Sequence, residues 1–214
     1  MATKFGDRDV QIRTCIYRGV ALLLGASALL VTAATFVPNL NAAVKDTPFV
    51  VSAFAIYGAG VLLSLVTAFV GGAITQKTVF ALLFVGLNML LMLVSAYGTA
   101  NAVIASLVTA MLIIGAASYL GGRIGTDTRS WGPLLVGGLL LVLLAELLNA
   151  FVFQASAAEV ALSTVAIVLF TAFTVYDVDT RSRGYCRFNC CLEGAFDVWI
   201  NFANIFLRAQ ELMD

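Results

Sequence analysis

Polar side chains recur along one face of the last apolar stretch of this chain. At about 100° per residue they fall within an arc of about 80° if the stretch is helical. Acids and amides inside a membrane-length helix are costly unless they face a polar interior. This face is therefore the first candidate for function. Its residues are Asp197, Asn201, Asn204, Arg208 and Glu211.

A carboxylate also ends the preceding apolar stretch. If the two stretches are antiparallel helices, Asp177, Asp197 and Asn201 lie at similar depth, a few turns from the cytosolic face. Converging carboxylate and amide oxygens suit a hard cation such as calcium, and two close carboxyl groups could equally share one proton. Asp177 is therefore a candidate calcium ligand and gate residue. The alternative is a helix-end carboxylate that only hydrogen-bonds in the membrane interface.

The membrane spans that the sequence predicts, given below, also suggest where Glu146, Asp197 and Asp179 lie. Glu146 stands about 15 residues into the fifth span, roughly 22 Å along a helix from its start, where a charge needs a partner. It is either a second carboxylate of an ion pathway or a protonated side chain that bonds a neighbouring helix. Asp197 belongs either to the gate or to the headgroup region. We expect Asp179 to be a solvated loop acid.

The composition requires lipid as the solvent. The chain is 61% hydrophobic and 11% charged, and its mean hydropathy is +1.00, far above that of a soluble domain. Windows of about 20 residues predict an all-α integral membrane protein, with one seven-helix domain at 18–214 after a cytosolic tail at 1–17. The predicted spans are 18–38, 49–71, 78–99, 102–122, 131–153, 159–178 and 195–212.

Basic residues set the expected orientation. With the N-terminus in the cytosol, 10 of the 12 Lys and Arg residues fall on the cytosolic side, as the positive-inside rule requires. We expect a multi-pass protein of the endoplasmic reticulum or Golgi in a eukaryotic or viral setting, and of the plasma membrane in a bacterium. The expected partners are the bilayer, calcium ions, protons and other membrane proteins. The balance of 12 acidic and 12 basic residues gives no reason to expect nucleic acid.

Missing residue types exclude several classes of protein. The chain has no histidine, which removes Ser-His and Cys-His nucleophile pairs and imidazole metal sites, so we expect no enzyme. The last lysine is Lys77, so no retinal Schiff base can form in a seventh helix.

The cysteines all fall on the expected cytosolic side, where a reducing environment disfavours disulfides. We expect unmodified thiols, with palmitoylation or a zinc site that includes Cys15 as alternatives. The four are Cys15, Cys186, Cys190 and Cys191.

A motif links the last two spans. The run F-x-x-F-x-x-Y-D at 170–177 is followed by a basic loop and by A-F-x-x-W-x-N-F-x-N-I-F-L at 195–207. These residues resemble the signature of the Bax inhibitor family, the transmembrane Bax inhibitor motif proteins, which reads approximately F-x-x-Y-D-T-Q and then A-L-x-L-Y-L-D-x-I-N-L-F-L. Residues 16–18 and 101–119 look similar too, so the likeness covers nearly the whole chain.

The resemblance implies a seven-helix bundle around a central C-terminal helix. It also implies a calcium leak across internal or bacterial membranes, and suppression of cell death where the host has that pathway. Two aspartates, one from each of the last two helices, would form a proton-sensitive latch. Asp177 matches the first, but Asn201 stands at the second, and an amide cannot titrate; Asp197, one turn away, is the only substitute. The family's second-helix arginine has no counterpart in 49–71.

Our leading hypothesis is therefore a calcium-permeable leak protein of the Bax inhibitor kind, without a resident cofactor and with calcium as a permeant or transiently bound ion. The first rival is a non-conducting membrane interaction protein that modulates survival or immune signalling. An orphan receptor-like protein is the second. The expected ion pathway and gate comprise Asp177, Asn201, Asp197 and Glu146, with Asn204 and Arg208 on the polar face of the last helix.

Overall fold

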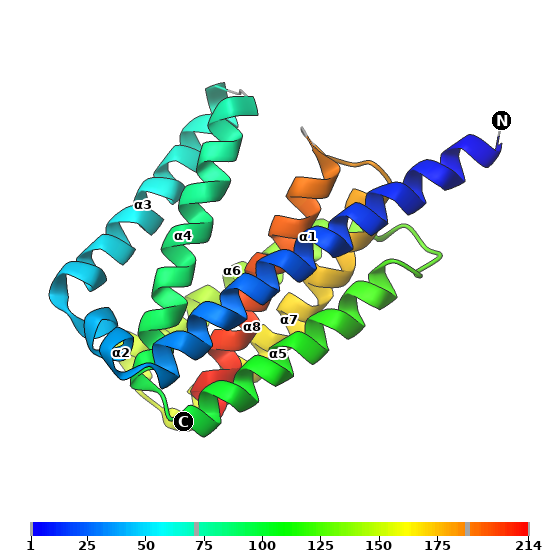
Figure 1. The fold of residues 1–214 in the computed structure, drawn as a ribbon. Coiled ribbons are helices and arrows are strands. Elements are labelled where there is room, and N and C mark those ends of the chain that lie inside the picture. The colour runs from blue at the N-terminus through cyan, green and yellow to red at the C-terminus, as the bar shows by residue number, and fades with distance from the viewer. Residues whose placement is uncertain (1, 71–72, 187–188, 214) are drawn as a thin grey trace. The chain divides into compact units, whose positions relative to one another are not determined.

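Helices make up the fold, as the composition predicts. The computed structural model describes residues 2–70, 73–186 and 189–213, and within these ranges it holds helices and short connections but no strand (Figure 1). The elements are α1 (Ala2–Phe36), α2 (Pro38–Lys45), α3 (Thr47–Val70), α4 (Ala73–Tyr97), α5 (Ala100–Gly121), the 3₁₀ turn η1 (Thr128–Ser130), α6 (Trp131–Leu148), the π-helical turn η2 (Asn149–Phe153), α7 (Ser156–Ser182) and α8 (Cys190–Met213).

Seven segments in the described ranges are long and apolar enough to cross a membrane, which confirms the predicted seven-span architecture. Their ends differ from the predicted ones by a few residues, except at the start: the tail at 1–17 was expected to precede the first helix, whereas α1 begins at Ala2. The last span is the most enclosed. Inside the protein, 61% of the α8 span is buried, against 44% or less for each other span.

The chain forms two compact units. In the unit Gly25–Ile104, α3 and α4 pack along each other. This contact depends on Gly86, because a Cβ atom there would lie 2.6 Å from the backbone nitrogen of Tyr57. Small residues let membrane helices approach in this way.

A short helix joins α1 to α3 in the same unit. Pro38 begins α2, a position where its missing N–H costs nothing. The amide of Asn41 donates to the carbonyls of Ala34 and Ala96, at 2.9 and 3.3 Å. These bonds fasten α2 to α1 and α4, so the connection is an ordered element.

The other unit, Met1–Leu24 with Ala105–Asp214, is built on α7 and α8, which pack side by side (Figure 1). The core is made mainly by the apolar face of α8, opposite its polar residues. Six side chains of this core are fully enclosed, with 0% exposure: Ile16, Val198, Trp199, Phe202, Ile205 and Phe206.

The connection between α7 and α8 is shorter than the predicted 179–194, because α7 runs on to Ser182 and α8 begins at Cys190. Gly184 ends α7 with a φ of 86°, a left-handed conformation that glycine adopts freely. Its N–H bonds the carbonyl of Arg181 at 3.0 Å, and the N–H of Tyr185 bonds that of Thr180 at 3.1 Å. This pair of bonds is the Schellman motif that commonly stops a helix.

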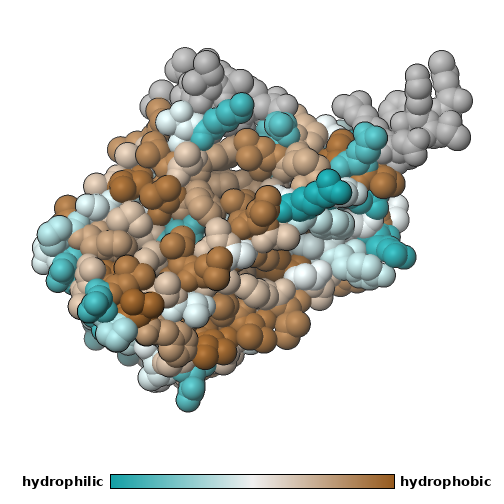
Figure 2. Space-filling view, viewed as in Figure 1, coloured by the Kyte–Doolittle hydropathy of each residue, from teal (hydrophilic) through white to brown (hydrophobic). Residues whose placement is uncertain are grey.

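Apolar side chains cover most of the visible surface, with hydrophilic ones in separate patches (Figure 2). Many large apolar residues are exposed on the spans, among them Leu134 at 77% and Phe151 at 79%. Such a surface is stable only against acyl chains. The protein is therefore a multi-pass membrane protein in contact with the bilayer.

We expect Phe202→Ala to destabilise the protein by about 3–5 kcal/mol, because it empties a fully enclosed site where the ring stacks 6.2 Å from Phe206. Phe151→Ala is the matched control, since that ring lies on the outer surface. Thermal unfolding in detergent should show a large drop for the first variant and little change for the second. Equal drops would show that α8 is not the core.

Candidate functional site: the polar seam between α7 and α8

A carboxylate and an amide meet across the two helices of the motif. The Nδ2 of Asn201 donates a hydrogen bond to the Oδ2 of Asp177 at 2.8 Å. Asp177 is 9% exposed and Asn201 5% exposed. The sequence predicts similar depth for these two residues, and the structure brings them into contact, one from each of the last two helices.

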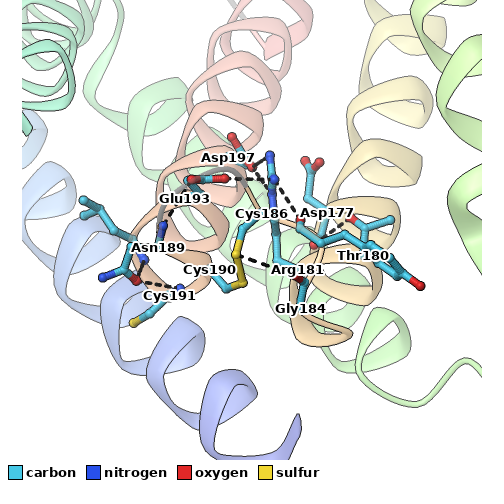
Figure 3. Close-up of a disulfide and its surroundings, with 12 residues drawn as sticks. Asp177, Thr180, Arg181, Gly184, Cys186, Asn189, Cys190, Cys191, Glu193 and Asp197 are labelled. Atoms are coloured by element: carbon cyan, nitrogen blue, oxygen red, sulfur yellow. Dashed lines mark hydrogen bonds and ion pairs between the residues drawn. A yellow bond between two sulfur atoms is a disulfide. The ribbon is translucent and has the colours of Figure 1, made fainter. Parts of the chain in front are cut away.

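An arginine one turn beyond Asp177 lies beside this pair. The guanidinium of Arg181 contacts the Oδ2 of Asp197 through Nε at 3.0 Å and Nη2 at 2.9 Å, and its Nη1 lies 2.9 Å from the Oε2 of Glu193. Nη1 also donates to the carbonyl of Tyr185 at 3.0 Å. Figure 3 shows the guanidinium facing the Asp197 and Glu193 carboxylates. One cation of α7 thus neutralises two acids from the first turns of α8.

Asp179 was expected to be a solvated loop acid, and that expectation was wrong. The side chain is 3% exposed, because α7 continues past it and turns it toward η1. Its Oδ2 accepts from the backbone N–H and the hydroxyl of Thr128 at 3.1 and 2.8 Å. Its Oδ1 accepts from the Nε of Arg183 at 2.7 Å, and this bond raises the pKa of Arg183. Asp179 therefore anchors η1 to α7.

Another ion pair joins η1 to Asp127, the residue before it. Arg129 donates to the carboxylate of Asp127 through its Nε at 2.7 Å and through its backbone N–H at 3.0 Å. These two hydrogen bonds hold the pKa of Asp127 below its ordinary value. Both side chains are exposed. This pair resembles the Arg181 cluster in chemistry but not in burial.

Glu146 belongs to a second cluster, at the other end of α8. Its Oε1 lies 2.6 Å from the Nη2 of Arg208, whose Nη1 lies 3.1 Å from the Oε2 of Glu211. The hydroxyl of Ser163 donates to that same carboxylate at 2.7 Å. These side chains line a cavity of about 180 Å³. Glu146 therefore pairs with a cation of α8 and is not part of the Asp177 cluster.

The polar face of α8 thus divides into two clusters. Asp197 and Asn201 face α7 near the start of α8, whereas Arg208 and Glu211 lie near its end with partners on α6 and α7. Asn204, between them, donates to the carbonyl of Ile200 on its own helix at 2.9 Å. The two clusters are therefore separate, and within the described residues Asn204 between them is not bonded to either.

Comparison with known proteins places the chain in a family. Residues 12–214 match the family described as "Inhibitor of apoptosis-promoting Bax1". The chain belongs to the Bax inhibitor family. Over 87 residues it is also 32% identical to an uncharacterized protein of Campylobacter jejuni. That stretch covers 41% of this chain and 36% of the relative, so the chain spans little more than a third of the relative's length.

Two residues of the seam were missed from the sequence, although their spacing could have revealed them. Arg181 follows Asp177 by four residues, and Glu193 precedes Asp197 by four. On a helix, residues four apart share a face. The family resemblance led us to look for an arginine in the second span, whereas in this chain α7 supplies the cation from the turn next to Asp177.

The cysteines are paired, which contradicts the expectation of unmodified thiols. Cys15 is bonded to Cys191 and Cys186 to Cys190, with Cα atoms 5.5 and 5.1 Å apart; the second bond lies beside Arg181 (Figure 3). The helical start of the chain brings Cys15 to α8, and the short connection brings Cys186 to Cys190. Disulfides persist in oxidising compartments, whereas the basic residues predict a cytosolic location for this end; the orientation stays a prediction.

Within the described residues, no three His, Cys, Asp or Glu side chains are grouped so as to hold a metal ion. Asp177 has an amide and not a second carboxylate as its nearest partner. Calcium at this position therefore stays a proposal, and it concerns an ion in passage.

We expect Arg181→Met to destabilise the protein by about 3 kcal/mol, because it leaves Asp197 and Glu193 facing each other without their shared cation. Arg129→Met is the control, since its pair with Asp127 is exposed and screened by water. Unfolding in detergent at neutral pH should separate the two variants. An unchanged midpoint for Arg181→Met would show that the cluster does not hold α7 to α8.

Proposed function

We propose that this protein is a calcium-permeable leak pathway whose gate is the contact of Asp177 with Asn201, flanked by Arg181 and Asp197. The observation that carries the proposal is a buried carboxylate that bonds an amide across two membrane-spanning helices. A carboxylate is costly in such surroundings and is usually functional when it occurs there. Membership of the Bax inhibitor family supports the same role.

Charge and geometry support a closed gate in this structure. The hydrogen bond of Asn201 and the ion pairs of Arg181 draw α8 against α7. A cation could pass only if these contacts separate, which would free oxygen atoms from Asp177, Asp197 and Glu193. Such oxygens suit calcium, which accepts flexible coordination by carboxylates and carbonyl groups. Through this leak the protein would modulate calcium stores and cell survival.

A second candidate function is a non-conducting protein that binds membrane partners. It is favoured by the arginine found in each cluster, because Arg181 and Arg208 already neutralise acids that a passing cation would use. The two functions differ in one measurable property, ion flux.

We expect Asp177→Ala to increase calcium leak about tenfold, because it removes a charged hydrogen bond that favours the closed pair. The assay measures calcium entry into dye-loaded liposomes that hold the purified protein. Asp127→Ala is the control, since that exposed carboxylate bonds Arg129 and is not part of the seam. If neither the wild type nor Asp177→Ala exceeds empty liposomes, the protein does not conduct and the interaction function gains.

We expect Asn201→Asp to make the leak depend on pH between about 6 and 8. The leak through the wild type should depend on pH only weakly. Two carboxyls at this distance would share one proton and attract, and loss of that proton would make them repel, so leak should rise with pH. Asn204→Asp is the control, because Asn204 bonds its own helix. An unchanged pH profile for Asn201→Asp would remove the latch from the mechanism.

A further inference from the structure

A groove of about 340 Å³ opens between α1 and α5, away from the polar seam. Its walls are apolar for most of their length. One end is polar and is lined by Tyr17, Ser118 and Tyr119. The hydroxyl of Tyr17 donates to the carbonyl of Ser118 at 3.1 Å. The two helices run in opposite directions (Figure 1). The apolar lining consists of Val20, Ala21, Leu24, Met111 and Ile114.

The groove has the dimensions of a lipid chain site. From Tyr17 to Leu24 the helix rises about 10 Å, which is most of the hydrocarbon depth of one leaflet, about 15 Å. A Cβ atom at Gly115 would meet nothing within 4 Å, so the groove is open at its middle.

Two arginines lie beside the polar end of the groove, next to its lining residues. The guanidinium of Arg123 lies 5.0 Å from the ring centre of Tyr119, a lining residue. Arg13 donates through Nη1 to the carbonyl of Gly122, and its buried Nε has no hydrogen-bond partner among the described residues. This end therefore attracts an anion.

A buried hydroxyl at the same end lacks a hydrogen-bond partner among the described residues. Ser118 lines the groove and is 6% exposed, and within the part of the chain that the structure describes its Oγ has no hydrogen-bond partner. Buried polar groups are rarely left so, because the loss of water is costly. An ester or phosphate oxygen at the head of the groove would satisfy it.

We propose that this groove is a binding site for an anionic phospholipid. One acyl chain lies along Val20, Leu24 and Met111, the phosphate lies between Arg13 and Arg123, and Ser118 donates to an oxygen of the head. Basic pockets between membrane helices bind anionic heads in this way. The site is separate from the Asp177 seam, so the proposal does not depend on ion conduction.

Native mass spectrometry of the purified full chain, with phosphatidylglycerol and phosphatidylcholine of identical acyl chains, tests the proposal. We expect the wild type to retain the anionic lipid at least about fivefold better. Arg123→Gln, at an exposed position, should lower that preference about fivefold. Equal retention of both lipids by the wild type, or an unchanged preference in Arg123→Gln, overturns the proposal.

A second variant tests the groove itself. Gly115→Leu places a side chain in the open space and should abolish selective retention of phosphatidylglycerol. Gly137→Leu is matched to it, since a Cβ there also meets nothing within 4 Å, but Gly137 lies on α6 outside the groove. If Gly115→Leu retains the anionic lipid as well as Gly137→Leu does, the lipid binds elsewhere and the proposal fails.

Discussion

Acidic side chains enclosed by apolar helices must each find a donor within hydrogen-bond reach, and this need sets the register of α7 against α8. Asp177 bonds Asn201, Arg181 reaches Asp197, and Ser163 bonds Glu211 far along the same pair of helices. A slip by one turn would break all of these contacts together. The cost of stranding even one buried charge is several kcal/mol. The register is therefore fixed by polar contacts, while apolar packing of α8 supplies the bulk of the core.

The position of Asn201 changes what the seam can do, compared with a pair of carboxyls. An amide keeps its N–H groups at every pH, so its half of the contact does not switch. The nearest acid on α8, Asp197, cannot take over that place freely, because Arg181 already holds it. In this member of the Bax inhibitor family, the contact between Asp177 and Asn201 would open only when α7 and α8 move apart as rigid helices.

Much of the fold could be predicted because lipid-exposed helices require long apolar runs, which the sequence displays openly. The pairing of Asp177 with Asn201 was also within reach, since helical phase and span direction determine it. Asp179 was placed wrongly because the end of α7 depends on the Gly184 turn, not on hydropathy. The partner of Glu146 could not be named, because pairing between distant helices depends on their packing.

The cysteine pairs were missed for the same reason, since the contact of Cys15 with Cys191 depends on a helical N-terminal segment that composition does not reveal. That bond has a topological consequence. It joins positions 176 residues apart, so the polypeptide between them is a closed ring. The ring runs from Cys15 in α1 to Cys191, the second residue of α8, and leaves out the rest of α8. A protease that cuts any loop within the ring would nick the molecule without releasing a fragment, and only a reductant would let the pieces part.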